Sequence, residues 1–191
     1  RHGAAVEDFG DRLVSPAFVN AHTHLALVFA RALDQGSATA GNTVEELFFR
    51  VERKLDAADV RALSRMGAYE SLLAGVGMVW DHYYFGSAVA DALRDVGLCG
   101  VVAPTLQDVS GPGADGWEAA LAETEALQAD ESLAAAGIGA ALGPHATDTV
   151  SADLWGRIAD AAQRLDLPIH VHLAQSIEEV ERSVERHGKE P

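Results

Sequence analysis

Five short apolar runs alternate along the chain with longer segments whose apolar residues recur at helical spacing. Gly75 follows the helical segment that starts near Ala57, and Ser151 and Ser176 stand where the last two helices should begin. Alternating strands and helices of this kind build right-handed parallel βαβ units. The predicted strands are residues 17–24, 76–82, 100–105, 138–142 and 168–174, and the predicted helices between and after them are residues 57–74, 86–96, 116–129, 151–165 and 176–187.

Five βα units predict an α/β fold, in the form of an incomplete (β/α)8 barrel. A closed barrel needs eight units and about 250 residues, whereas this chain has 191. We therefore expect residues 15–191 to form part of a barrel and residues 1–14 to be a short lead-in. Thr43 followed by Glu46 matches a capping box and predicts a further helix start. Residues 25–42 are predicted to be a long loop, of the kind that commonly covers a binding site.

Two histidines close the first predicted strand. His22 and His24 are two residues apart, so in a strand their side chains point to the same face. Two imidazoles placed in this way can bind one metal ion, and the carboxyl ends of parallel strands are where barrels build active sites. Taken alone, the pair could equally be two polar residues at a strand end.

Further histidines follow the later predicted strands, whose ends should face the same rim of a barrel. His170 and His172 repeat the spacing on the fifth strand, and spacing alone does not choose which of them would join the metal pair. His145 follows the fourth strand, where it could contact a ligand or be structural. His82 ends the second strand, and it too could contact a ligand or be structural. Asp81 beside it could orient a ligand or cap the next turn.

The charge balance narrows the classes of partner. The chain has Asp+Glu 29 against Lys+Arg 14, which gives a formal charge of −15. Repulsion from phosphates argues against nucleic acid and against an anionic membrane surface, and leaves a small molecule as the expected partner. Without a signal peptide or an apolar stretch of about 18 residues, the expected location is the cytoplasm.

Three motifs together resemble one known family. They are PAFVNAHTHL at residues 16–25, GPHATDTVS at 143–151 and HVHLA at 170–174. In this order and at these distances they resemble the amidohydrolase superfamily, in its chlorohydrolase, cytosine deaminase and S-adenosylhomocysteine deaminase branch. The resemblance covers residues 13–187. It implies a (β/α)8 barrel with a small β-sandwich built from both chain ends, of which residues 1–14 would be a remnant.

The resemblance also implies roles for the histidines. His22, His24 and His172 would be ligands for one divalent metal ion, with zinc the first choice and iron or manganese the alternatives. His145 would contact the substrate. The reaction implied is hydrolysis of a C–N bond by a metal-activated water, as deamination of a small nitrogen heterocycle. Dehalogenation or amide hydrolysis on a similar ring is the alternative reaction.

One residue departs from the family pattern. The third residue after the fifth-strand ligand is usually a Glu that shuttles protons, and here it is Gln175. An amide cannot accept and return a proton at neutral pH. Three alternatives follow. An Asp on the family's eighth strand does all the base work, the substrate needs no protonation by this residue, or the protein is an inactive or non-catalytic binding protein.

The resemblance further implies that two ligands are missing. A His on the sixth strand and an Asp on the eighth would lie beyond Pro191, and the chain lacks an initiator Met, so we expect both ends to be cut. Open strand edges favour association. We therefore expect the chain alone to be inactive, and to form a homo-oligomer or to associate with its missing C-terminal half.

Overall fold

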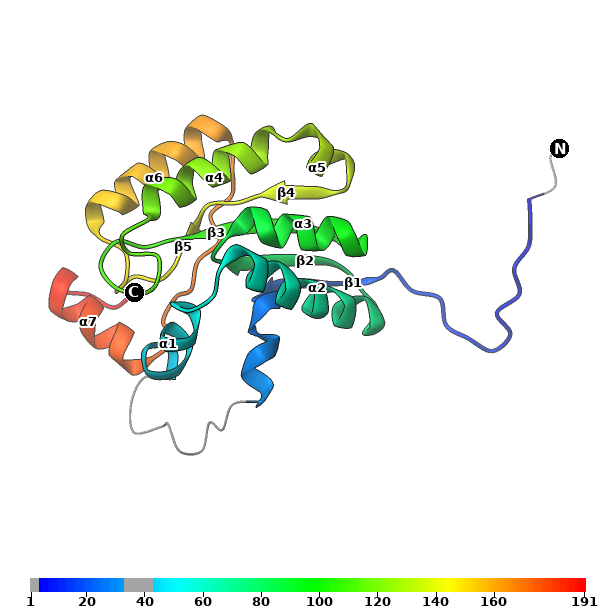
Figure 1. Cartoon of the computed structure of the whole chain (residues 1–191), viewed down its shortest axis with the longest axis horizontal. Coiled ribbons are helices and arrows are strands. Elements are labelled where there is room, and N and C mark those ends of the chain that lie inside the picture. Colours follow the sequence, from blue (N-terminus) through cyan, green and yellow to red (C-terminus); the bar gives the residue numbers. More distant parts are fainter. Residues whose placement is uncertain (1–3, 33–42) are drawn as a thin grey trace.

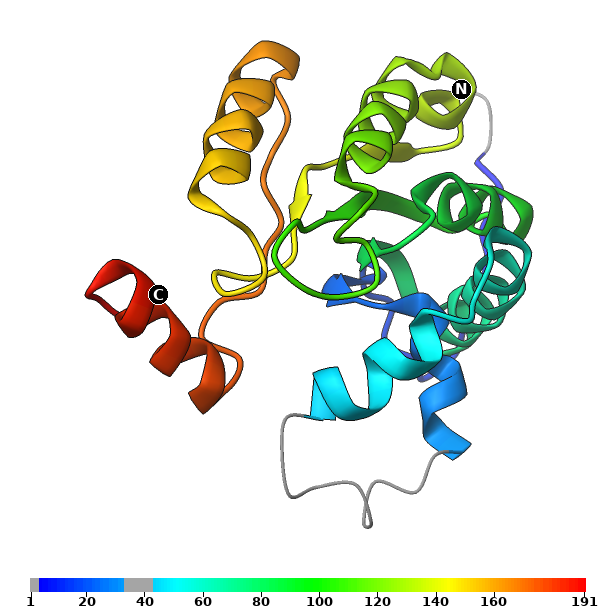
Figure 2. The ribbon, with the colours of Figure 1, turned by 60° about the vertical axis from the view of Figure 1, so that its left-hand side comes forward.

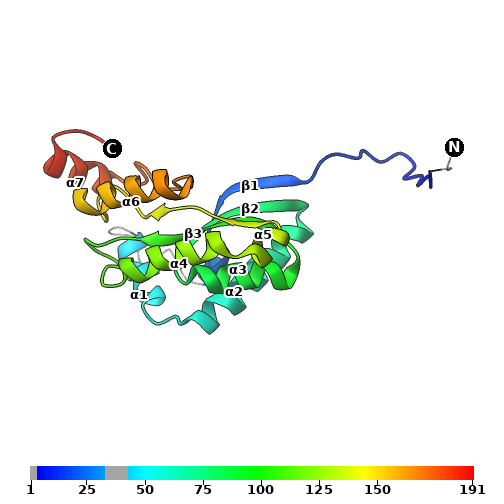
Figure 3. The same cartoon turned by 90° about the horizontal axis from the view of Figure 1, so that it is seen from above.

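The computed structural model describes residues 4–32 and 43–191. Its described strands form a parallel sheet with helices packed along one face (Figures 1 and 3). The strand order is β1-β2-β3-β4, and β5 pairs with β3 beyond the end of β4. The strands are β1 (Phe18–Thr23), β2 (Val76–Tyr83), β3 (Cys99–Leu106), β4 (Ile138–Ala140) and β5 (Gly143–Pro144).

The longer helices follow one another around the strands in chain order, along an arc (Figure 2). They agree with the predicted helices to within one residue at each end, and the α/β fold with parallel strands is confirmed. The longer helices are α2 (Ala57–Leu73), α3 (Gly86–Val96), α4 (Trp117–Ala129), α6 (Ala152–Leu165) and α7 (Ile177–His187), and the shorter ones are η1 (Leu25–Ala32), η2 (Val44–Phe48), α1 (Phe49–Glu52) and α5 (Glu131–Ala135).

Side-chain caps explain where the last two long helices begin. The Ser151 hydroxyl oxygen accepts from the Leu154 amide, and that of Ser176 accepts from the Glu179 amide, so both predicted N-caps are confirmed. A helical segment does begin at Thr43, as predicted, but Thr43 makes no capping hydrogen bond, so the capping box predicted there is wrong. Its φ of −56° and ψ of −33° are already helical, whereas an N-cap residue needs extended backbone.

The hydrophobic core lies between the sheet and its helices. Val79 of β2, Val102 of β3 and Leu93 of α3 are fully buried members of it. The segment predicted as a loop contributes too, because its residues 25–32 form η1, and Leu25 is buried. A Cβ atom at Gly67 of α2 would lie 2.4 Å from the Leu25 carbonyl oxygen, so glycine allows η1 to pack this closely. Residues 33–42 of that predicted loop lie outside the described residues.

The predicted fourth strand is divided into β4 and β5. The register is the same on both sides of the break, since Val102 pairs with Ala140 and Thr105 with Gly143. Pro104 lies opposite the break and has no N–H to donate to the ladder. β4 and β5 are therefore two parts of one predicted strand, with a short break in the hydrogen bonding between them.

Residues 168–174, predicted as the fifth strand, run beside β5 without forming a regular strand. One isolated parallel bridge joins Ile169 to Leu142. The His170 amide donates to the Leu142 carbonyl (2.8 Å), and the His172 amide donates to the His145 carbonyl (3.1 Å). No described strand pairs with the other edge of this segment, which explains why the ladder stays short.

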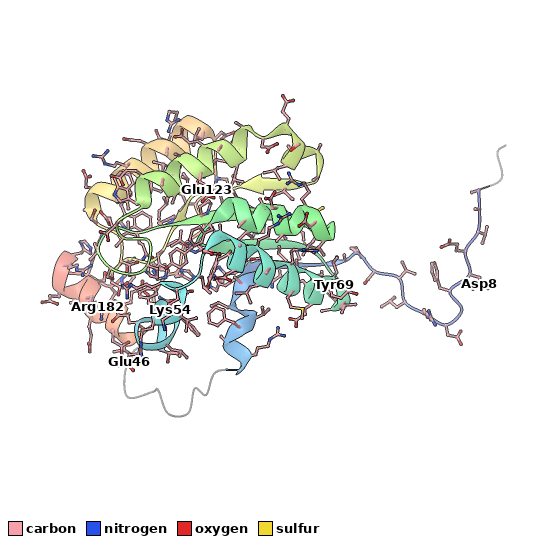
Figure 4. The ribbon with its side chains drawn as sticks, viewed as in Figure 1. Asp8, Glu46, Lys54, Tyr69, Glu123 and Arg182 are labelled. Carbon is pink, nitrogen blue, oxygen red and sulfur yellow. The ribbon has the colours of Figure 1, made fainter. Side chains whose placement is uncertain are left out.

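The N-terminal segment lies apart from the body of the molecule. Residues 4–17 contain no helix or strand and are exposed, and Asp8 marks this extended segment in Figure 4. Their assignment to the remnant of a small β domain stays a prediction. In the described part of the chain, no helix has the length and apolar character needed to cross a membrane.

Candidate metal centre

Histidines gather where the carboxyl ends of the strands meet, as the sequence predicts. His172 lies at the centre of the group. Its ring centroid is 4.6 Å from that of His82, 4.9 Å from that of His22, and 5.1 Å from those of His24 and His145. The six histidines of this cluster are His22, His24, His82, His145, His170 and His172.

Backbone carbonyl groups orient two of these rings. The Nδ1–H of His24 donates to the His82 carbonyl (2.5 Å), and the Nδ1–H of His172 donates to the His145 carbonyl (2.6 Å). A carbonyl oxygen only accepts, so each Nδ1 carries the proton and each Nε2 keeps a free lone pair. The two Nε2 atoms lie 3.2 Å apart. Facing lone pairs at this distance repel each other unless a cation lies between them.

The spacing suits a metal ion. Two nitrogen atoms bonded to a tetrahedral zinc ion at 2.0–2.1 Å are about 3.3 Å apart, close to the separation of the Nε2 atoms of His24 and His172. His22 adds a third nitrogen, and one ligand atom from each of the three residues lies within 4.8 Å of the others. The structure thus brings together the three residues that the resemblance implies.

Burial keeps the imidazoles of the cluster in the form that binds metals. It lowers the pKa of His24 to about 4 and that of His170 to about 4. It also lowers the pKa values of His22 and His172. Neutral imidazole is the metal-binding form, so the donor set fits a divalent ion at neutral pH.

His170 and His172, which spacing alone does not separate, have different surroundings. His172 directs its Nε2 toward His24, whereas His170 places its Nε2 2.8 Å from the Nδ1 of His22. His172 therefore belongs to the three-histidine group, and His170 contacts that group from outside.

His145 is positioned to offer a free nitrogen to a ligand. The Thr149 hydroxyl donates to the Ala146 carbonyl (3.4 Å) and so accepts from the Nδ1–H of His145 (2.9 Å). This leaves the Nε2 of His145 as an acceptor. Burial lowers the pKa of His145 to about 3, which keeps its ring neutral.

His82 and Asp81 have structural partners. The His82 ring nitrogens lie 3.3 Å from the Thr105 hydroxyl and 3.3 Å from the Pro144 carbonyl oxygen. Asp81 is fully buried and accepts from the Leu25 amide (2.6 Å), so it holds the backbone directly after His24. Because Leu25 is the first residue of η1, this contact favours the capping role among the two roles expected for Asp81.

A cavity of about 120 Å³ opens beside the histidines. Glu52 of α1 lines it, is buried, and has its pKa raised by burial to about 7. Tyr83 also lines it, and a hydrogen bond from its hydroxyl to the Glu52 carboxyl partly offsets the rise in the pKa of Glu52. Sequence reasoning missed Glu52, because an acidic residue inside a helical run gives no spacing signal. The full lining is His24, Leu27, Val44, Phe48, Phe49, Glu52, His82, Tyr83, Tyr84, Thr105, His145, His172 and Gln175.

The wall of this cavity that η2 and α1 form is tied to α7. Arg182 of α7 makes ion pairs with Glu45 of η2 and, at 3.0 Å, with Asp148. Figure 4 shows Arg182 near Glu46 of η2 and near Lys54, which follows α1. Distant parts of the chain therefore close the cavity together.

Gln175 lines the same cavity at a strained turn. Ala174 before it has a φ of +52°, a conformation that non-glycine residues rarely adopt. The buried Glu179 carboxylate accepts from the Gln175 amide (2.8 Å) and from the Thr147 hydroxyl (2.8 Å). These bonds fix the backbone from which the Gln175 side chain extends.

Fold and site together define a class: an α/β-barrel protein whose histidines gather at the carboxyl ends of its strands. A sequence model of the amidohydrolase family matches residues 13–191. The chain therefore belongs to the amidohydrolase family, and the resemblance stated from its motifs is confirmed.

Two relatives illustrate the similarity. The 5-methylthioadenosine/S-adenosylhomocysteine deaminase of Desulfovibrio desulfuricans is 36% identical over 194 residues, which cover 100% of this chain and 42% of the relative. The 5'-deoxyadenosine deaminase of Methanothrix thermoacetophila is 32% identical over 184 residues, which cover 96% of this chain and 42% of the relative. The chain thus spans less than half the length of these relatives.

A solved structure agrees with the fold. The crystal structure of an adenosine deaminase from Xanthomonas campestris with bound zinc is similar with a TM-score of 0.77 at 25% identity, covering 92% of this chain and 40% of that one. The predicted partial barrel is therefore confirmed as the fold class.

Proposed function

We propose that this chain is the metal-binding part of an aminohydrolase that removes the amino group from the purine ring of an adenosine-like nucleoside. The observation that carries the proposal is the convergence of the His24 and His172 Nε2 atoms, 3.2 Å apart. The names of the relatives support the substrate class. Because the chain spans less than half of them, the activity is proposed for the complete polypeptide. A cytoplasmic location stays a prediction.

His22, His24 and His172 would hold one divalent ion, and zinc suits a site built from imidazole nitrogens. Such an ion supplies a Lewis acid and lowers the pKa of water toward about 7. The chain's own residues bind and orient the substrate. His145 can accept a hydrogen bond from an N–H group of the substrate through its free Nε2. Glu52, with its pKa raised by burial to about 7, can bind a substrate hydroxyl in either protonation state.

Ammonia release from 5'-deoxyadenosine and 5-methylthioadenosine tests this proposal. We expect the complete zinc-loaded polypeptide to release ammonia, and we expect chelation to stop the reaction until zinc is returned. His172→Ala should abolish the reaction, whereas His187→Ala, which changes an exposed histidine of α7, should leave it unchanged. Absence of ammonia release from every adenosine analogue by the zinc-loaded protein would contradict the proposal.

Gln175 favours a second candidate, a protein that binds the nucleoside without turning it over. An amide cannot carry a proton, and loss of a general acid–base group costs about 10²–10⁴-fold in rate. Gln175→Glu separates the candidates: an inert wild type and an active variant would identify a binding protein. An active wild type with an unchanged variant would place the base work on another residue. Gln163→Glu, on the exposed side of α6, is the matched control and should change nothing.

A further inference from the structure

The three candidate metal ligands are oriented by two different kinds of partner. His24 and His172 each donate from Nδ1 to a backbone carbonyl oxygen. The Nδ1 of His22 instead lies 2.8 Å from the Nε2 of His170, a side-chain nitrogen. One proton must lie between these two nitrogens, because two facing lone pairs or two facing N–H groups would repel.

We propose that His170 is a positioning residue, which accepts the Nδ1–H of His22 and so turns the Nε2 of His22 toward the metal site. This inference rests on the proposed function, in that the bound group is a metal ion. The opposite arrangement would give His22 an Nε2–H, and a protonated nitrogen cannot ligate a metal ion. Donation from His22 to His170 is therefore the arrangement compatible with three ligands.

The surroundings of His170 hold it in place for this role. Its backbone amide donates to the Leu142 carbonyl (2.8 Å). Its ring lies nearly coplanar with that of His22, as an in-plane hydrogen bond requires, with centroids 4.8 Å apart and an interplanar angle of 26°. On another side it meets the Trp80 ring, at 5.5 Å between centroids. The two histidines of the 168–174 segment thus have different roles. His172 binds the metal ion, and His170 orients the metal ligand His22.

Zinc affinity measured by chelator competition tests the role without any substrate. Loss of a residue that orients a metal ligand typically weakens metal affinity about 10–100-fold. We expect this loss in His170→Phe, which keeps an aromatic ring at this position and removes the acceptor. His170→Gln can place an amide oxygen near the position of Nε2 and should restore affinity to within a few-fold of wild type. The absorption bands of bound Co²⁺ should shift in His170→Phe and return in His170→Gln.

His187→Phe is the control, because it makes the same change of residue type at an exposed position of α7, outside the histidine cluster. It should bind zinc like the wild type. Wild-type affinity in His170→Phe would overturn the inference and leave the proposed function intact. Complete loss of zinc in both His170 variants, as in His172→Ala, would overturn it by making His170 a ligand. A wild type that binds no zinc would overturn the proposed function itself.

Discussion

At the scale of single residues, backbone carbonyl groups decide which histidines can bind a metal. The His82 and His145 carbonyls take the Nδ1 protons of His24 and His172 and leave the Nε2 atoms free. These carbonyls come from residues 58 and 27 positions away from the rings they hold. Spacing along the sequence therefore finds the histidine pairs, whereas ring orientation depends on distant backbone.

Glu179→Ala tests how far one buried carboxylate supports the Gln175 turn. The change leaves the backbone N–H of Gln175 and the hydroxyl of Thr147 without their acceptor. A hydrogen bond to a charged group contributes about 1.5–3 kcal/mol. We expect the free energy of unfolding in urea to fall by about 2–4 kcal/mol. Glu181→Ala, an exposed change on the same helix, should alter it by less than about 0.5 kcal/mol. Equal effects of the two variants would count against this role of Glu179.

The buried titratable groups also predict a pH dependence of stability. Burial lowers the pKa of His24 to about 4 and of His145 to about 3, from an ordinary value of 6.5. The unfolded chain therefore gains protons first as pH falls, and stability present above pH 6.5 is lost toward the lower pKa values. Burial raises the pKa of Glu52 and Asp81 to about 7, so their contribution changes in the opposite direction.

The six histidines of the cluster, all with lowered pKa, outnumber these two carboxyl groups. We expect the free energy of unfolding of the metal-free protein to rise between about pH 4.5 and 6.5. Urea unfolding in the presence of a chelator measures it. A free energy that stays level or decreases over this range would show that the histidines are not buried in the neutral form.

At the scale of elements, the helices were predictable because their signals are local. Ser151 and Ser176 cap α6 and α7 through residues three positions ahead. Strand continuity depends on neighbours that the sequence does not reveal, such as Pro104 opposite the break between β4 and β5. The position of Glu52 in the cavity could not be predicted for the same reason, because the packing of α1 beside the histidines depends on tertiary contacts.

Ser151→Ala should destabilise the chain more than an ordinary cap mutation. Ser151 caps α6 and also donates from its hydroxyl (2.5 Å) and its amide (2.7 Å) to Asp108. Loss of an N-cap costs about 0.5–2 kcal/mol, and the lost hydroxyl bond to a charged group adds to this. We expect a fall of about 2 kcal/mol in the free energy of unfolding. Ser87→Ala, at an exposed position in α3, is the control and should have almost no effect. A similar fall in both variants would contradict the capping argument.

At the scale of the whole molecule, apolar side chains remain exposed at both ends of the sheet. Phe18 is 67% and Val19 60% exposed on β1, and Leu173 is 59% exposed on the segment that follows β5 in space. In a complete barrel the further strands would pair with these edges. The relatives, with more than twice the length of this chain, have room for such strands.

The exposed edges predict that the 191-residue chain associates when it is prepared alone. Sedimentation should show dimers or larger species at micromolar concentration. Phe18→Ser and Leu173→Ser together should reduce association, whereas Met66→Ser, which changes an exposed apolar residue of α2, should not. A compact wild-type monomer that unfolds cooperatively would contradict the prediction.

Anomalous diffraction at the zinc edge, on crystals of the complete polypeptide grown with zinc, tests the central claim most directly. We predict a single strong peak about 2.0–2.1 Å from the Nε2 atoms of His24 and His172 and from one nitrogen of His22. A peak bound to His170 in place of His172, or no peak within reach of these three residues, would contradict the account.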